Sequence, residues 1–159
     1  MKTMFAKTLV LSLILTTSTA ALAAEQIASG AGHFPTGPDG DLRTFAFVAN
    51  KDSSGVTVGE LQLNNRALDS KTHAQIDCLV VDGNVATMSG FVERNTAAAP
   101  FPEGTPILVQ VVDHGEGAGA PTDQISLMFL FPGGPGFPCT TPNLVLPLNE
   151  IEQGNIQVH

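Results

Sequence analysis

The stretch THAQIDCLVVDGNVATMSGFV, residues 72–92, decides the fold. Two runs rich in β-branched and apolar residues, 72–81 and 84–92, lie on either side of Asp82-Gly83. An Asp-Gly pair in this position is typical of a β-hairpin with a type I′ turn, because that turn needs φ > 0 at both central residues. We therefore predict an antiparallel hairpin that turns at Asp82 and Gly83.

The rest of the chain after the N-terminal leader has the same pattern of short apolar runs separated by turn residues. Its 16 Gly and 11 Pro residues separate short apolar runs, and no segment keeps the helical period for more than about two turns. Pro38-Asp39-Gly40 predicts a turn, since proline fixes φ and glycine accepts φ > 0. Further strands are predicted at 26–34, 42–49, 56–63, 106–113, 124–131, 144–148 and 155–158.

These runs predict an all-β domain of about eight strands in sequential order. An antiparallel up-and-down barrel satisfies the strand edges of such a domain, and a two-sheet β-sandwich is the alternative that periodicity does not separate from it. The predicted core consists of Phe45, Phe47, Leu61, Leu63, Ile76, Val80, Val85, Phe91, Val109, Val111, Ile125, Leu127 and Phe129.

Residues 1–23 have the pattern of a signal peptide. Lys2 and Lys7 precede a short apolar run, 9–15, and small residues end in Ala21-Leu22-Ala23. The run is shorter than the roughly 20 residues needed to span a bilayer, and no longer apolar run follows. We expect cleavage after Ala23, a single β-domain at 24–159, no membrane span in the mature chain, and a secreted or periplasmic location.

Charge limits the partners. The chain has 7 Lys and Arg against 15 Asp and Glu, and loss of Lys2 and Lys7 makes the mature part more acidic still. Such a surface repels phosphate backbones and anionic lipid, so nucleic acid is a poor partner. The chain also has no Trp and no Tyr, which weakens a carbohydrate-binding interpretation because exposed Trp or Tyr usually carries the sugar ring. The oligomeric state is not predicted.

Cys78 and Cys139 are the two cysteines of the chain. In an oxidising compartment they predict one disulfide, and the chain-entropy estimate for so long a loop is about 4 kcal/mol. A catalytic thiol or a metal pair is the disfavoured alternative, because a secreted cysteine nucleophile would leave its companion unpaired.

The glycine-rich segment 113–123 is the first candidate for a ligand site. Asp113, Glu116 and Asp123 offer hard oxygen ligands that suit calcium, although their spacing does not match the helix-loop-helix calcium motif. The alternative is a solvated connection whose acidic side chains cap neighbouring backbone N–H groups. We expect no other cofactor.

Arg43, Asp77 and Glu93 are the second candidate set, for ligand binding inside the barrel. Arg43 begins a Phe-rich strand, Asp77 lies within a strand, and Glu93 ends one. A buried arginine–carboxylate pair would either specify the fold or contact a ligand. If Asp77 points inward it needs a partner, and Arg43 or Arg66 would supply it.

Other chemistry has little support. The four histidines lack the local spacing of a zinc site, no Gly-x-Ser-x-Gly elbow is present, and the Gly133-Gly134-Pro135-Gly136 run has no lysine beside it to hold a phosphate. We therefore predict no catalytic residues.

Several strings spread over the mature chain resemble a family of small exported bacterial β-domains, mostly uncharacterised. The chain differs from that family at His114, where Asn is commoner. The resemblance implies an exported β-domain, found alone or attached to larger surface proteins, and implies no known activity. The strings are Ser29-Gly30-Ala31-Gly32-His33-Phe34, Arg43-Thr44-Phe45-Ala46-Phe47, Ile76-Asp77-Cys78-Leu79-Val80-Val81, Gly83-Asn84-Val85-Ala86, Val112-Asp113-His114-Gly115-Glu116-Gly117 and Gly154-Asn155-Ile156-Gln157-Val158.

The leading functional hypothesis is a non-catalytic exported domain that binds a partner or a small ligand at the cell envelope. The alternatives are a small barrel enzyme, of isomerase or cyclase type with one buried polar group, and a calcium-stabilised structural module. A cavity of about 300 Å³ or more that collects Arg43, Asp77 or Glu93 would favour ligand binding or catalysis in the interior. A filled interior would leave recognition at the surface.

Overall fold

The computed structural model describes residues 24–36, 41–67, 69–96, 101–142 and 144–159. The predicted signal peptide and the predicted turn at Pro38-Asp39-Gly40 lie outside these residues. In the described part every regular element is a strand, which confirms the all-β prediction. No helix among these residues is long and apolar enough to cross a membrane. The strands are β1 (Gln26–Thr36), β2 (Asp41–Lys51), β3 (Thr57–Asn65), β4 (Ser70–Asp82), β5 (Val85–Asn95), β6 (Pro106–Val112), β7 (Gln124–Phe129), β8 (Asn149–Glu150) and β9 (Gln153–Val158).

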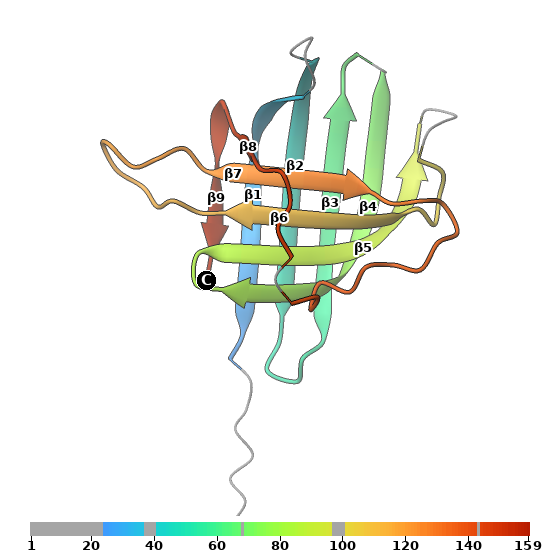
Figure 1. Cartoon of the computed structure of the whole chain (residues 1–159), viewed down its shortest axis with the longest axis horizontal. Coiled ribbons are helices and arrows are strands. Elements are labelled where there is room, and N and C mark those ends of the chain that lie inside the picture. The colour runs from blue at the N-terminus through green and yellow to red at the C-terminus, as the bar shows by residue number, and fades with distance from the viewer. Residues whose placement is uncertain (1–23, 37–40, 68, 97–100, 143) are drawn as a thin grey trace, which may run out of the picture.

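The nine strands form one antiparallel sheet in the order β8-β7-β6-β5-β4-β3-β2-β1-β9. Each strand from β1 to β8 therefore pairs with its neighbour in sequence, as in the predicted up-and-down arrangement. The sheet curls into a half-barrel: β1–β3 run upright in Figure 1, β6 and β7 run across in front of them, and β4 and β5 bend between the two directions.

The predicted hairpin is confirmed, but its turn is shifted by one residue. Asp82 pairs with Val85, so the two central residues are Gly83 and Asn84. Gly83 has φ +60°, and Asn84 is not among the residues with positive φ. A positive φ at the first central position alone corresponds to a type II′ turn, which favours glycine there, and not to the predicted type I′ turn.

Two β-bulges in the β4–β5 pair change which side chains face inward. The register shifts between His73 and Ala74 and between Ile76 and Cys78. Before the second shift Ala74 and Ile76 enter the core, and beyond it Leu79 does. Most of the predicted core is confirmed, but Val80, Val85 and Phe91 are wrong: Val80 and Val85 line a hollow on the outer face, and Phe91 is 43% exposed. The bulge at Asp77 reverses the alternation for Val80. Val85 and Phe91 lie on the outer face of β5, where both faces carry apolar residues, so alternation does not show which face is buried.

The predicted strand at 144–148 is absent, and these residues instead cross the outside of the sheet. We call residues 132–142 and 144–148 the strap. Its last part passes in front of β5, β6 and β7 in Figure 1. The Gln110 side chain on β6 receives a hydrogen bond from the Leu146 N–H (3.4 Å) and donates to the Leu144 carbonyl oxygen (3.2 Å). Prolines 142 and 147 remove backbone donors, which prevents regular strand pairing here.

The strap explains why β6 is buried on both faces. All 7 residues of this strand are buried. Ile107, Val109 and Val111 belong to the core inside the barrel, whereas Leu108 and Gln110 alternate with them and face the strap. An antiparallel strand with one solvated face would alternate apolar and polar residues, so the continuous burial of β6 reflects a second covering layer.

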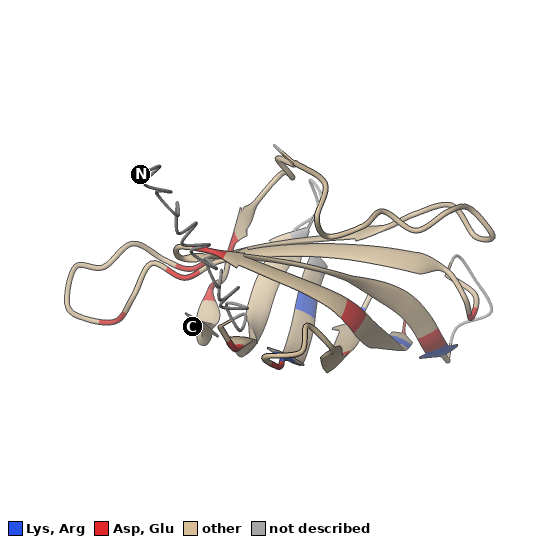
Figure 2. Ribbon diagram, turned by 90° about the horizontal axis from the view of Figure 1, so that it is seen from below, with Lys and Arg blue, Asp and Glu red and all other residues tan. Residues whose placement is uncertain are grey.

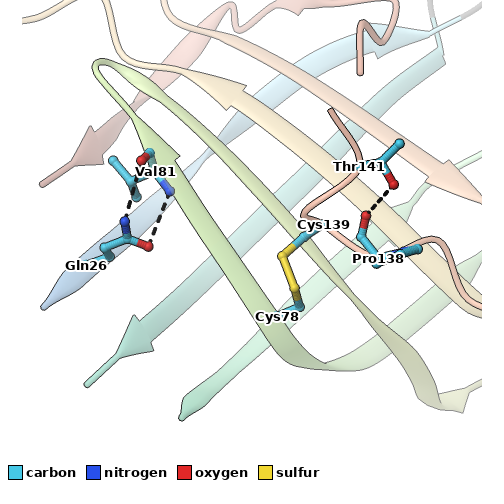
Figure 3. The surroundings of a disulfide bond; sticks show 6 residues. All are labelled: Gln26, Cys78, Val81, Pro138, Cys139 and Thr141. Atoms are coloured by element: carbon cyan, nitrogen blue, oxygen red, sulfur yellow. Dashed lines mark hydrogen bonds between the residues drawn. A yellow bond between two sulfur atoms is a disulfide. The ribbon is translucent and has the colours of Figure 1, made fainter. Parts of the chain in front are cut away.

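A disulfide between Cys78 and Cys139 ties the strap to β4 (Figure 3), which confirms the predicted pairing. The two Cα atoms are 5.9 Å apart. Such a bond persists in oxidising compartments and is rare in reducing ones. Near it, the side-chain amide of Gln26 bonds to both the N–H and the carbonyl oxygen of Val81, at 3.4 and 3.5 Å, and so links β1 to the far end of β4.

Removal of the disulfide should destabilise the fold without changing its topology. We expect the Cys78→Ala/Cys139→Ala double variant to lose roughly 2–4 kcal/mol of unfolding free energy, because the cross-link restricts the unfolded chain. Urea unfolding of the mature protein measures this loss. A reductant should lower the midpoint of the wild type towards that of the variant and leave the variant unchanged. Equal midpoints of wild type and variant in oxidising buffer would contradict the prediction.

Gly90 should be required where β5 bends against β4. A Cβ at this position would collide with the carbonyl oxygen of Gln75 and approach the Ile76 Cα. We expect Gly90→Ala to lower the free energy of unfolding by about 1–3 kcal/mol, as overpacking does. Gly136→Ala is the control, because its Cβ would meet only the Phe91 ring at an ordinary 3.5 Å. Thermal unfolding compares the two, and an equal effect would count against the bend as the cause.

Candidate functional site

Side chains fill the interior of the half-barrel. Phe34, Phe45, Leu61, Ile76 and Met88 are each at most 1% exposed and belong to one apolar cluster. Polar residues occupy one end of the inner face, where Asn65, Ser70 and Thr72 are buried. Among the described residues, apolar side chains therefore occupy the interior, and the hollow described below opens to solvent.

The predicted set Arg43, Asp77 and Glu93 does not come together. Arg43 alternates with Phe45 on β2 and so faces inward, at the polar end of the interior. Asp77 lies at the β4 bulge and is exposed, so it needs no buried partner. The Glu93 side chain is 64% exposed and contacts His73. The three residues therefore lie in three separate parts of the fold and do not form one site.

A groove of about 510 Å³ lies on the outer face of β2–β5. Its lining includes two neighbouring rows of residues from the outer face, together with Phe45, Leu63 and Thr72 between the rows. Ala46 leaves space on β2, and longer side chains on β3, β4 and β5 border that space. The first row consists of Ala46, Gln62, His73 and Arg94, which are paired in register, and the second of Thr44, Asn64, Lys71 and Thr96. We call these eight residues the outer groove.

His73 is held in the groove by two carboxylates. Its Nδ1 lies 2.9 Å from an oxygen of Glu93, and its Nε2 lies 3.2 Å from an oxygen of Glu60. Both nitrogens donate at once when the imidazole is protonated, and the two contacts fix the plane of the ring. The carboxylates come from different strands, because Glu60 is on β3 and Glu93 is the extra residue of the β5 bulge.

The outer groove differs in charge from the rest of the molecule. Its lining includes Lys71 and Arg94 and no Asp or Glu. Glu60 and Glu93 each lie within 4.0 Å of His73, and among the described residues no such ion pair joins Lys71 or Arg94 to a carboxylate. Figure 2 shows that basic positions are few and acidic ones are spread over strands and loops.

Outside the groove, Asp52 accepts hydrogen bonds in the turn between β2 and β3. The largest effect comes from the Ser54 hydroxyl, and together these bonds lower the pKa of Asp52.

The three predicted calcium ligands all contact strand β9. Asp123 is 7% exposed; its two oxygens accept hydrogen bonds from the backbone N–H groups of His114 and Ile156, each at 2.8 Å. Asp113 accepts the Val158 N–H at 3.0 Å. An oxygen of Glu116 accepts a hydrogen bond from the side-chain amide of Asn155 at 2.8 Å.

These contacts favour the capping alternative for the acidic loop. No group of three or more His, Cys, Asp or Glu side chains among the described residues is arranged to hold a metal ion. Segment 113–123 therefore stabilises the fold, because its carboxylates accept hydrogen bonds from β9 N–H groups that do not pair with another strand.

Comparisons with protein-family models, curated proteins and solved structures gave no match. The outer groove is thus identified by its geometry alone. Sequence reasoning placed Glu93 among the candidates but missed Gln62, Asn64, Lys71 and His73. The available signal was that polar residues alternate along the adjacent segments 60–64 and 71–75, which marks one solvated face of a strand pair.

Asp123 should stabilise the attachment of β9. We expect Asp123→Asn to lose about 1.5–3 kcal/mol of unfolding free energy, because an amide has one acceptor oxygen and hydrogen bonds to a charged acceptor are worth about this much. Urea unfolding measures the loss, and amide exchange at Ile156 should become faster.

Glu116→Gln is the matched control for this substitution. It retains an acceptor for Asn155 on an exposed side chain, so its effect should stay within about 0.5 kcal/mol. Unchanged exchange at Ile156 in Asp123→Asn would contradict the role given to Asp123.

Proposed function

We propose that this protein is an exported, non-catalytic recognition domain of the cell envelope that binds its ligand in the outer groove. The observation that carries the proposal is the groove itself: residues of four adjacent strands, with Thr96 just after β5, line one open hollow of about 510 Å³. The signal-peptide pattern of residues 1–23 and the disulfide support the export of the chain.

The groove is suited to recognition because its parts are rigid. Hydrogen-bonded strands hold the backbone of every lining residue except Thr96, whose backbone N–H bonds to the Lys71 carbonyl oxygen at 3.0 Å. A site on strands changes little when a ligand binds, which lowers the entropy lost on binding. Polar side chains in a shallow hollow provide hydrogen bonds that discriminate between ligands.

The geometry favours binding over catalysis. His73 is the one imidazole in the lining of the groove, and each of its ring nitrogens faces a carboxylate. A general base needs a free nitrogen directed at the proton that it removes. His73 therefore serves as a fixed wall of the groove in this proposal.

A blocking substitution tests the proposal. Phenylalanine at Ala46 would extend from the floor and fill the hollow without removing any polar group. Because Ala46 is exposed, we expect its effect on stability to be within about 0.5 kcal/mol. The test is a thermal-shift screen of compounds found at the cell envelope, including saccharides, peptides and small organic anions. Compounds that raise the melting temperature of the wild type should not raise that of Ala46→Phe.

Val58→Phe is the matched control, since Val58 is 68% exposed on β3 and lies outside the groove. It should retain every hit of the wild type. Hits that survive in Ala46→Phe, or a screen without any hit, would contradict the outer groove as the binding site.

A further inference from the structure

We propose that the ligand of the outer groove is an acidic saccharide, whose carboxylate binds Lys71 and Arg94 while its hydroxyl groups bind Gln62 and Asn64. This inference rests on the proposed function and goes further, because it names the chemical class that the groove accepts.

Charge segregation gives the first reason. The chain has 7 basic against 15 acidic residues, yet two cations and no carboxylate line this groove. The nearest carboxylates, Glu60 and Glu93, contact His73. The charges of Lys71 and Arg94 are therefore available to an anion, and Arg94 can bind a carboxylate in a bidentate manner.

The size and the neutral groups of the groove give the second reason. A volume of about 510 Å³ is far larger than an inorganic anion needs, given that a water molecule occupies about 30 Å³. The amides of Gln62 and Asn64 each offer both donors and acceptors, whereas the Thr44 hydroxyl already bonds to His33 Nδ1 at 2.9 Å. Vicinal hydroxyl groups of a sugar ring pair with such groups, whereas an apolar ligand would leave them unsatisfied.

The absence of Trp and Tyr limits the interactions that could hold such a ligand. The chain has neither residue, so no indole or phenol ring supports a sugar ring from below. Binding must then depend on charge and hydrogen bonds, at an exposed site where salt screens the charge. The proposal therefore predicts an affinity that falls steeply with ionic strength and an ester of the same sugar that binds poorly.

Calorimetric titration of the mature protein with oligogalacturonate tests the inference, and the fully methyl-esterified oligomer and inorganic phosphate serve as comparison ligands. We expect the acid to bind at low salt and to lose affinity at least about tenfold in Lys71→Gln/Arg94→Gln, in line with the strength of charge-assisted hydrogen bonds. Gln62→Ala/Asn64→Ala should also weaken it. The control variant, Lys51→Gln/Arg66→Gln, removes the same charge outside the groove and should bind as the wild type does.

The outcomes separate the two proposals. If the ester binds as tightly as the acid, and Gln62→Ala/Asn64→Ala abolishes both, the groove is a recognition site but its ligand is not selected by charge. If phosphate binds as tightly as the oligomer, the saccharide part of the inference is wrong. If neither oligomer binds, or if the control variant loses affinity as the groove variant does, the inference fails. The Ala46→Phe screen then decides separately whether the proposed function stands.

Discussion

A curled sheet has two edges to satisfy, and this fold satisfies both with one segment. Asn149–Glu150 pairs with β7 at one edge, and Gln153–Val158 pairs with β1 at the other. Between them, the Ile151 and Glu152 N–H groups bond to backbone carbonyls of Asp123 and His33. Where β9 lacks a neighbouring strand, the carboxylates of Asp113 and Asp123 accept its N–H groups. Unpaired edges invite pairing with other chains, so this segment protects both ends of the curled sheet.

The outer groove follows from that curvature and from strand register. Its two rows exist because four strands are aligned so that Ala46 meets Gln62, Gln62 meets His73, and His73 meets Arg94. A slip of one residue in any pair would turn its lining residue inward. The bulge at Glu93 has a local role too, since it directs an extra carboxylate towards His73. The site is thus a property of the assembled sheet, and no single strand carries it.

Much of the fold was predictable from local pattern, because strands, turns and the cysteine pair have compositional signals. The Asp82-Gly83 region gave the hairpin, and the two cysteines gave the disulfide. The facing of Val80 was not predictable, because a bulge shifts alternation by one residue without a distinctive composition. The facing of Val85 and Phe91 was not predictable either, because both faces of β5 carry apolar residues. The groove was missed for a related reason. β2, β3 and β4 each contribute three lining residues and β5 contributes one, and the sequence of a single strand does not reveal its register with its neighbours.

The strap has a consequence for the protein before its cysteines are joined. Residues 106–112 are buried on both sides, and the outer side is covered by a connection that is rich in proline and lacks regular pairing. Before the disulfide forms, this strand can lose its cover and become accessible to strands of other chains. Exposed segments that are short, uncharged and of high β-propensity are prone to form fibrils. Oxidation of Cys78 and Cys139 keeps the cover in place. The thiol chemistry of its compartment therefore governs the solubility of this protein as well as its stability.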